Sequence, residues 1–116
     1  MLVLASTYVF EYWRETYGKP RAKLDANRLR VILRAVNACE GHLSDLLYAF
    51  DGAKRDDWIM GRALGSTSKY DTPETILRDR ASVERHADRI SGWGRDESHP
   101  AIASLPPALT EAASWT

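Results

Sequence analysis

The stretch LDANRLRVILRAVNACEGHLSDLLYAFDG, from Leu24 to Gly52, predicts two amphipathic helices in succession. In its first half the large apolar residues recur at i, i+3, i+4 and i+7, which is the spacing of one face of an α-helix. These residues are Leu29, Ile32, Leu33 and Val36. Asp25 is a favourable N-cap for this helix. Arg30 and Arg34 are expected on the opposite face, with Arg28 on its flank.

The second half repeats the same spacing. Its apolar residues are Leu43, Leu46, Leu47 and Phe50. The dipeptide Asp51–Gly52 is predicted to end this helix, because glycine is common where helices stop. Cys39, the single cysteine of the chain, is expected to be a buried thiol that needs no oxidising compartment.

A further helix is predicted before this pair, over residues 4–17. Its large side chains lie at helical spacing and are Val9, Phe10, Trp13 and Tyr17. Gly18 suits the position after a helix, and Pro20 cannot continue one. The helix is therefore expected to stop at Gly18.

One more helix is predicted from Thr72 to about Ser91, with a bend allowed. Thr72, Pro73 and Glu74 are typical of an N-cap, a first helical position and an acidic first turn. The expected apolar stripe is Ile76, Val83, Ala87 and Ile90, and the expected i,i+4 ion pair is Arg80 with Glu84.

The connection between the third and fourth predicted helices contains unusually many apolar groups for a loop. Residues 56–60 are expected to form one helical turn whose Trp58 and Met60 cap the bundle, so that Trp58→Ala would cost about 3–5 kcal/mol. Residues 61–68 are expected to be mobile, with Leu64 of undecided burial. Tyr70 is expected to pack on the core.

The fold class predicted is all-α: a small bundle of about four helices with an irregular loop over residues 52–71. The 116 residues suggest one domain. That domain is placed at residues 1–92. Residues 93–116 are rich in proline, serine and alanine and are predicted to be a flexible tail. The sequence has no predicted membrane span, and a cytoplasmic location is expected.

No enzymatic chemistry is expected, and no cofactor or metal. His42, His86 and His99 have no metal-ligand spacing among themselves or with Cys39. The chain also contains no nucleophile elbow, P-loop or dinucleotide fingerprint. The adjacent Asp56 and Asp57 are more typical of helix-start acids than of a catalytic pair.

The charge is unevenly distributed, although the formal net charge of the chain is zero. Residues 14–34 have a net charge of +5, and residues 40–57 have a net charge of −3. Cations in such a cluster could contact phosphate oxygens, and Trp13 or Tyr17 could stack on bases or pack in the core. The predicted nucleic-acid contacts are Arg14, Lys19, Arg21, Lys23, Arg28, Arg30 and Arg34.

A second set of residues predicts protein contacts. These are apolar side chains beyond the needs of a small core: Trp58, Met60, Leu64, Trp93 and Trp115. Exposed aromatic side chains with arginines around them are frequent binding hot spots. The DNA-contact and protein-contact interpretations stay open at this point.

Three blocks of the sequence together resemble the conserved C-terminal helical domain of phage and prophage replication proteins. They are VFEYWRETYGKPRAKLDANRLRVI (residues 9–32), LLYAFDGAKRDDWIMG (residues 46–61) and KYDTPETILRDRASVERHADR (residues 69–89). His42 stands where that family usually has an aromatic residue, and a packing role is expected for it. The family's winged-helix domain has no counterpart in this chain.

The resemblance implies a small helical module of a replisome organiser or helicase loader, loosely DnaD-like. Its expected role is that of a DNA-replication accessory that binds without catalysis. The partners implied are DNA, bound weakly and in a salt-sensitive way, and a replicative helicase or host replication protein. The alternative is a stand-alone protein-interaction module, which binds or inhibits a host factor or associates with itself and has no nucleic-acid function.

Overall fold

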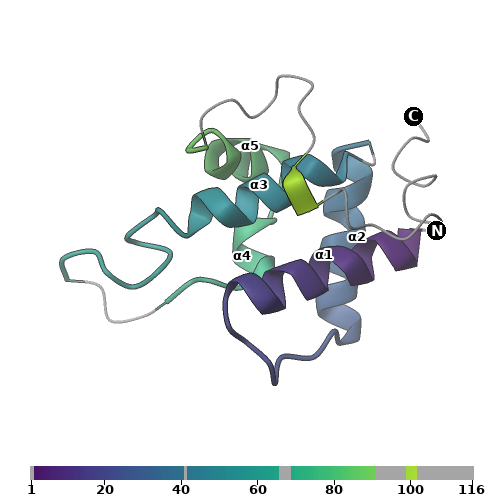
Figure 1. The fold of residues 1–116 in the computed structure, drawn as a ribbon, viewed down its shortest axis with the longest axis horizontal. Coiled ribbons are helices and arrows are strands. Elements are labelled where there is room, and N and C mark those ends of the chain that lie inside the picture. The colour runs from purple at the N-terminus through teal and green to yellow at the C-terminus, as the bar shows by residue number, and fades with distance from the viewer. Residues whose placement is uncertain (1, 41, 66–68, 91–98, 102–116) are drawn as a thin grey trace.

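The computed structural model describes residues 2–40, 42–65, 69–90 and 99–101. These residues form five helices and no strand: α1 (Leu2–Thr16), α2 (Ala26–Ala38), α3 (Leu43–Ala53), α4 (Pro73–Ile76) and α5 (Arg80–Ala87). Figure 1 shows α3 in the middle of the assembly, and it contacts all four other helices. The predicted all-α class is therefore confirmed for the described part of the chain. Within that part, every helix is too short or too polar to cross a bilayer.

The first helix ends as the sequence predicts. Gly18 has a positive φ of 62°, which glycine adopts without a steric penalty. The N–H of Gly18 donates to the carbonyl of Glu15, and the N–H of Lys19 donates to the carbonyl of Arg14. This pair of bonds is a Schellman motif, and it turns the chain away from α1 at a defined angle.

The second helix begins after Asp25, as predicted. The Asp25 side chain accepts a hydrogen bond from the backbone N–H of Arg28 at 2.8 Å. Ile32 and Val36 are completely buried, whereas Leu29 and Leu33 lie at the edge of the buried face. The apolar stripe of α2 therefore faces the core, and the opposite side of the helix remains in solvent.

The third helix does not end at Asp51–Gly52, so that prediction is wrong. All four apolar residues predicted for α3 are buried, but the helix continues through Gly52 to Ala53. A Cβ atom added to Gly52 would lie 1.7 Å from the carbonyl oxygen of His86. Glycine is present here because the backbones of α3 and α5 meet at this point.

The last predicted helix is divided in two. It begins after Thr72 with Pro73 as expected, but α4 ends at Ile76. Asp79 then adopts an extended conformation and its side chain accepts from the N–H of Ser82 at 2.7 Å, which starts α5 as a separate helix. The prediction of a single helix over residues 72–91 is thus wrong, because Asp79 caps a new N-terminus. The expected Arg80–Glu84 ion pair is present at 3.1 Å.

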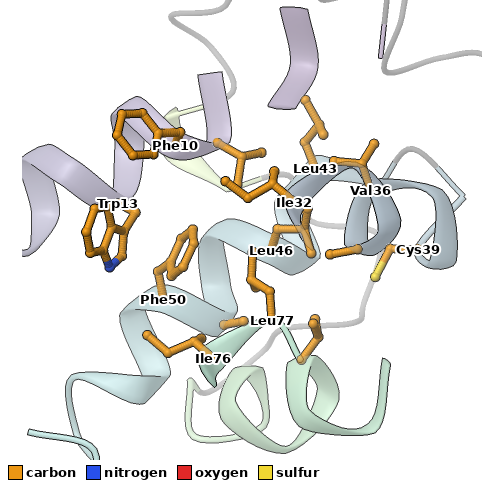
Figure 2. Close-up of a cluster of buried hydrophobic side chains, with 14 of the residues drawn as sticks. Phe10, Trp13, Ile32, Val36, Cys39, Leu43, Leu46, Phe50, Ile76 and Leu77 are labelled. Carbon is orange, nitrogen blue, oxygen red and sulfur yellow. The ribbon is translucent and has the colours of Figure 1, made fainter. Parts of the chain in front are cut away.

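The core lies between α1, α2 and α3 and continues to α4 and α5 (Figure 2). Trp13 is its largest residue and is 2% exposed. Phe50 and Leu46 point from α3 toward the centre of the cluster, and Cys39 lies at its edge (Figure 2). Burial raises the pKa of the Cys39 thiol to about 11, so the residue stays a neutral thiol at pH 7 and is a poor nucleophile.

Acid is expected to weaken the fold through His86. This side chain is 1% exposed, and neither ring nitrogen has a hydrogen-bond partner among the described residues. Burial, assisted by the nearby Arg85, lowers the pKa of His86 from 6.5 to about 4. Because the folded state keeps the ring neutral, stability is fully present above the unfolded pKa and decreases as the pH falls toward 4. The expected loss at pH 5 is about 2 kcal/mol.

Urea unfolding at pH 7 and pH 5 measures this loss. The matched variant is His86→Leu, which has a similar volume and no titratable group. We expect the variant to lose about 2 kcal/mol less than the wild type between the two pH values. Equal losses in the two proteins would show that His86 does not cause the acid sensitivity.

Candidate nucleic-acid interface

The connection between α1 and α2 positions three of the seven predicted phosphate-binding cations. The Schellman motif at Gly18 fixes where this connection starts, and the Asp25 cap fixes where it ends. Between them, the N–H of Ala22 donates to the carbonyl of Lys19 at 3.0 Å and forms a turn. Lys19, Arg21 and Lys23 lie on this turn and the residues that follow it. The loop therefore presents them beside the N-terminal half of α2.

A pocket of about 390 Å³ lies under this loop. It is lined by Trp13, Lys19, Pro20, Arg21, Ala22, Arg28 and Thr72. The guanidinium of Arg28 lies 5.2 Å from the centre of the Trp13 ring, which is a cation–π distance. Because Trp13 is buried, it forms the floor of the pocket and is not free to stack on a base. The same geometry excludes the base-stacking alternative for Trp13.

Tyr17 also packs in the structure. Its ring lies beside those of Trp13 and Phe50, and its hydroxyl donates to the carbonyl of Phe50 at 2.6 Å. Burial raises the pKa of Tyr17 above its ordinary value. Trp13 is therefore a core residue, and Tyr17 packs against the core.

Three of the seven predicted cations are paired with carboxylates. Arg14 pairs with Glu11 on α1. The ammonium nitrogen of Lys19 lies 3.2 Å from the buried carboxylate of Asp71. These two cations are therefore partly neutralised within the protein itself.

The pair between Arg28 and Glu74 is the most complete of the three. Arg28 Nε lies 2.6 Å from Glu74 Oε1, and Arg28 Nη2 lies 3.2 Å from Oε2, so the contact is bidentate. The hydrogen bond to Glu74 raises the pKa of Arg28. This ion pair connects α2 to α4 and holds the guanidinium at the wall of the pocket. Arg28 is better suited to positioning α2 than to binding a phosphate.

The other four predicted cations are exposed, and no carboxylate in the described ranges pairs with them. They are Arg21, Lys23, Arg30 and Arg34. Arg21 and Lys23 lie on the loop, and Arg30 and Arg34 lie one turn apart on α2. We call these four residues the free basic set. The helix that carries two of them has no acidic residue between Ala26 and Ala38.

Sequence reasoning overlooked two asparagines beside the free basic set. Asn27 and Asn37 are exposed and lie on the same side of α2 as Arg30 and Arg34, at i, i+3, i+7 and i+10. The sequence did contain a sign of this polar face, because these four polar residues also recur at helical spacing. It is less visible than the apolar stripe because asparagine is common in loops and caps.

The apolar residues predicted for protein contacts differ in how exposed they are. Trp58 is 54% exposed and stacks on Tyr70 with ring centres 5.4 Å apart. Leu64 is fully exposed, and Met60 is partly buried against the core. Trp93 and Trp115 lie outside the described residues, as does most of the predicted tail. The prediction that Tyr70 packs on the core is wrong, because its side chain is 37% exposed and stacks on Trp58 instead.

The prediction that Trp58 caps the bundle is wrong, and Ile59 has that role instead. Ile59 is 5% exposed, and its carbonyl accepts from the N–H of Tyr70 at 2.7 Å. The Asp56 side chain accepts from the N–H groups of Trp58 and Ile59, which forms the turn. In a turn, adjacent residues point in different directions, so burying Ile59 directs Trp58 outward.

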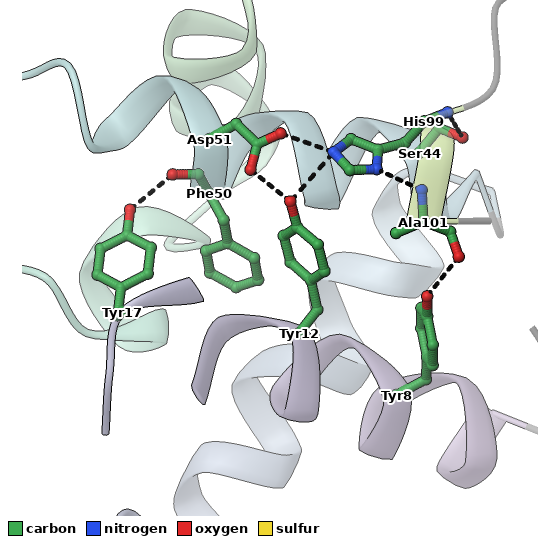
Figure 3. A network of polar contacts seen from close by, with 8 residues as sticks. All are labelled: Tyr8, Tyr12, Tyr17, Ser44, Phe50, Asp51, His99 and Ala101. Atoms are coloured by element: carbon green, nitrogen blue, oxygen red, sulfur yellow. Dashed lines mark hydrogen bonds and ion pairs between the residues drawn. The ribbon is translucent and has the colours of Figure 1, made fainter. Parts of the chain in front are cut away.

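A polar network joins the only described residues of the predicted tail to α1 and α3 (Figure 3). His99 Nε2 lies 2.6 Å from Asp51 Oδ2, and the N–H of Ala101 donates to His99 Nδ1 at 3.0 Å. Tyr12 donates to the other oxygen of Asp51, and Tyr8 donates to the carbonyl of Ala101. Burial and the Asp51 contact raise the pKa of Tyr12.

The polar groups of this network are bonded to one another, and none is left free to bind a ligand at His99. Both ring nitrogens of His99 are occupied, and the ring is buried at 6% exposure. A general base or a metal ligand needs a free nitrogen lone pair, and the bond from Ala101 already uses the one at Nδ1. The geometry therefore fits a structural anchor for residues 99–101. Among the described residues, no group of three His, Cys, Asp or Glu side chains is arranged to hold a metal ion.

Comparison of the chain with models of protein families, with curated proteins and with solved structures finds no match in any of the three. The resemblance to phage replication proteins therefore stays a prediction from the three sequence blocks quoted above.

Proposed function

We propose that this protein is a non-catalytic DNA-binding module that contacts the phosphate backbone through the free basic set. The observation that carries the proposal is that only some of the cations in residues 14–34 form ion pairs with carboxylates. Lys19 and Arg28 are held by carboxylates of the segment around α4, whereas Arg21, Lys23, Arg30 and Arg34 are left exposed. Unpaired exposed cations release counterions from DNA when they contact its phosphates, and such binding is weak and salt-sensitive.

The biological setting is proposed from the sequence blocks alone. They support a phage-type DNA-replication accessory that acts in the cytoplasm, either on DNA directly or by docking to a replicative helicase or host replication protein. The buried thiol and the closed His99 network are consistent with a role that does not involve catalysis.

Removing two members of the free basic set is expected to weaken DNA binding. Arg30→Ala with Arg34→Ala should lower affinity on the order of tenfold at about 50 mM salt, because two phosphate contacts are lost. Both side chains are exposed and alanine favours helices, so the fold should be preserved. Fluorescence anisotropy with labelled oligonucleotides of about 20 nucleotides, single- and double-stranded, measures the change.

The matched control is Arg78→Ala with Arg85→Ala, which removes the same charge from exposed positions outside α2. This control should bind within about twofold of the wild type, because phosphate contacts are short-ranged in salt. If both double variants lose the same affinity, net charge and not the free basic set governs binding. If the wild type binds no oligonucleotide at about 50 mM salt, the proposal fails.

A second candidate function is docking to a protein through the exposed pair of Trp58 and Tyr70. The stacking of two exposed aromatic rings, on a loop that also carries the fully exposed Leu64, favours it. Large aromatic side chains are enriched among binding hot spots. The expected partner is a replicative helicase or host replication protein, and a second copy of this chain is the alternative.

The variant Trp58→Ala is expected to lose at least about tenfold in capture of such a partner from nuclease-treated host lysate, as for a hot-spot residue. The matched control is Leu4→Ala. It also truncates an exposed apolar side chain, but one that lies on α1 and away from the loop that carries Trp58. Size-exclusion chromatography of the same variants tests self-association. Undiminished capture by Trp58→Ala would remove Trp58 from the interface.

A further inference from the structure

The exposed side of α2 carries a row of four side chains of only two types. Asn27, Arg30, Arg34 and Asn37 are all exposed, and the rotation of about 100° per residue places them within an arc of about 80°. The helix contains no acidic residue that would interrupt this row. The row therefore presents only amide and guanidinium groups to the solvent.

We propose that this row enters the major groove of double-stranded DNA, where Asn27 and Asn37 contact the edges of the bases while Arg30 and Arg34 contact the phosphates beside the groove. The inference rests on the proposed function and specifies its substrate. Asparagine can bind the N6 and N7 atoms of adenine with two hydrogen bonds, whereas the longer arginine side chains can reach phosphates. The adenine pattern is presented in the major groove. Asn27 and Asn37 are uncharged, so their place in the row is not explained by the counterion release that drives phosphate binding by cations.

The dimensions of the helix fit this groove. An α-helix with its side chains is about 10–12 Å wide, and the major groove of B-DNA is about 12 Å wide. The ten-residue separation between Asn27 and Asn37 corresponds to about 15 Å along the helix axis, or about four base pairs. Asp25 and Glu40 lie just beyond the two ends of the row. Their negative charges confine the contact to the length between them.

The fold holds α2 in a fixed rotation. Ile32 and Val36 are completely buried on the side of α2 that faces the core, and Arg28 is bound to Glu74 on α4. The Asp25 cap fixes the N-terminal end. In Figure 1 the loop that follows α3 and carries Trp58 extends away from α2. The row is therefore presented without rearrangement of the core and apart from that loop.

The same features disfavour single-stranded nucleic acid at this surface. Single strands are usually bound by aromatic side chains on which the bases stack. The aromatic side chains that are exposed in the described ranges are Trp58 and Tyr70, which belong to the loop before α4. Duplex RNA is disfavoured because its major groove is deep, narrow and inaccessible to side chains. Duplex DNA is the substrate that remains.

Anisotropy titrations of the full chain at about 50 mM salt test the inference. The probes are one mixed-sequence DNA duplex of about 20 base pairs, its single strand and the RNA duplex of the same sequence. Methyl green serves as a major-groove competitor and netropsin as a minor-groove competitor. We expect the DNA duplex to bind at least about tenfold more tightly than the RNA duplex. Methyl green should displace the protein, and netropsin should not.

The variant Asn27→Ala with Asn37→Ala keeps every charge and separates base contacts from phosphate contacts. In selection from a random duplex library, the wild type should enrich a preferred site of about four base pairs, and this variant should lose the enrichment while keeping its salt dependence. Equal affinity for the three nucleic acids with no effect of methyl green would overturn the inference and leave the proposed function standing. Absence of binding to all three would refute both.

Discussion

Replacement of Gly52 by alanine is expected to destabilise the protein by about 3 kcal/mol, even though alanine gains about 1 kcal/mol over glycine in helix propensity. The added methyl group would lie 1.7 Å from the carbonyl oxygen of His86 and 2.7 Å from its carbonyl carbon. Both are backbone atoms, so no side chain can rotate away. Helices α3 and α5 would have to separate along the surface on which they pack.

Urea unfolding of Gly52→Ala measures this effect, and Gly18→Ala is the matched control. A methyl group added at Gly18 would have no atom within 4 Å, and only the positive φ of 62° opposes alanine there. The control should therefore lose only about 1 kcal/mol. If Gly52→Ala is as stable as the control, the two helices do not touch at Gly52.

Replacement of Trp13 by alanine is expected to lower the free energy of unfolding by about 3–5 kcal/mol. Trp13 is 2% exposed and packs beside Phe10 and Tyr17. Its indole N–H donates to the carbonyl of Asp71 at 2.8 Å, which attaches the loop before α4 to α1. The variant would lose this packing, leave the Asp71 carbonyl without its donor and open the pocket floor. A domain of ordinary marginal stability would be largely unfolded by such a loss.

The matched control for Trp13→Ala is the same substitution at Trp58. Trp58 is 54% exposed, so its truncation should cost about 1 kcal/mol or less, mostly through the stack with Tyr70. Thermal or urea unfolding of the two variants side by side gives the comparison. A larger loss at Trp58 than at Trp13 would mean that the burial of the two side chains is reversed in solution.

The helices with a strong apolar period were predictable from the sequence. The apolar spacing predicts both α2 and α3, and the Asp25 cap predicts where α2 begins. Both helices and the cap are present in the structure. Such agreement arises because the side chains that bury an amphipathic face are fixed by the helical repeat itself.

One of the two helix boundaries that were wrong depends on a tertiary contact, and the other depends on a local cap. In the sequence, Gly52 resembles the end of a helix. The structure shows that glycine is needed there because the backbone of α5 lies against it. Asp79 lies inside a continuous helical pattern but caps a new helix through Ser82.

The candidate interface was predictable as a charge cluster but not as a surface. The sequence shows seven cations over residues 14–34, yet it does not show that Asp71 and Glu74 return to neutralise Lys19 and Arg28. Those pairs join positions that are far apart in the chain. The turn that buries Ile59 and exposes Trp58 was also missed, because both residues are apolar and adjacent.

The salt dependence of DNA binding tests most directly the claim that the free basic set contacts phosphates. Four phosphate contacts predict a slope of log affinity against log salt of about −3.6 for duplex DNA, and loss of Arg30 and Arg34 should reduce its magnitude by about 1.8. The control that lacks Arg78 and Arg85 should keep the wild-type slope. A slope near zero, or one that is the same in the wild type and in Arg30→Ala with Arg34→Ala, would contradict the account.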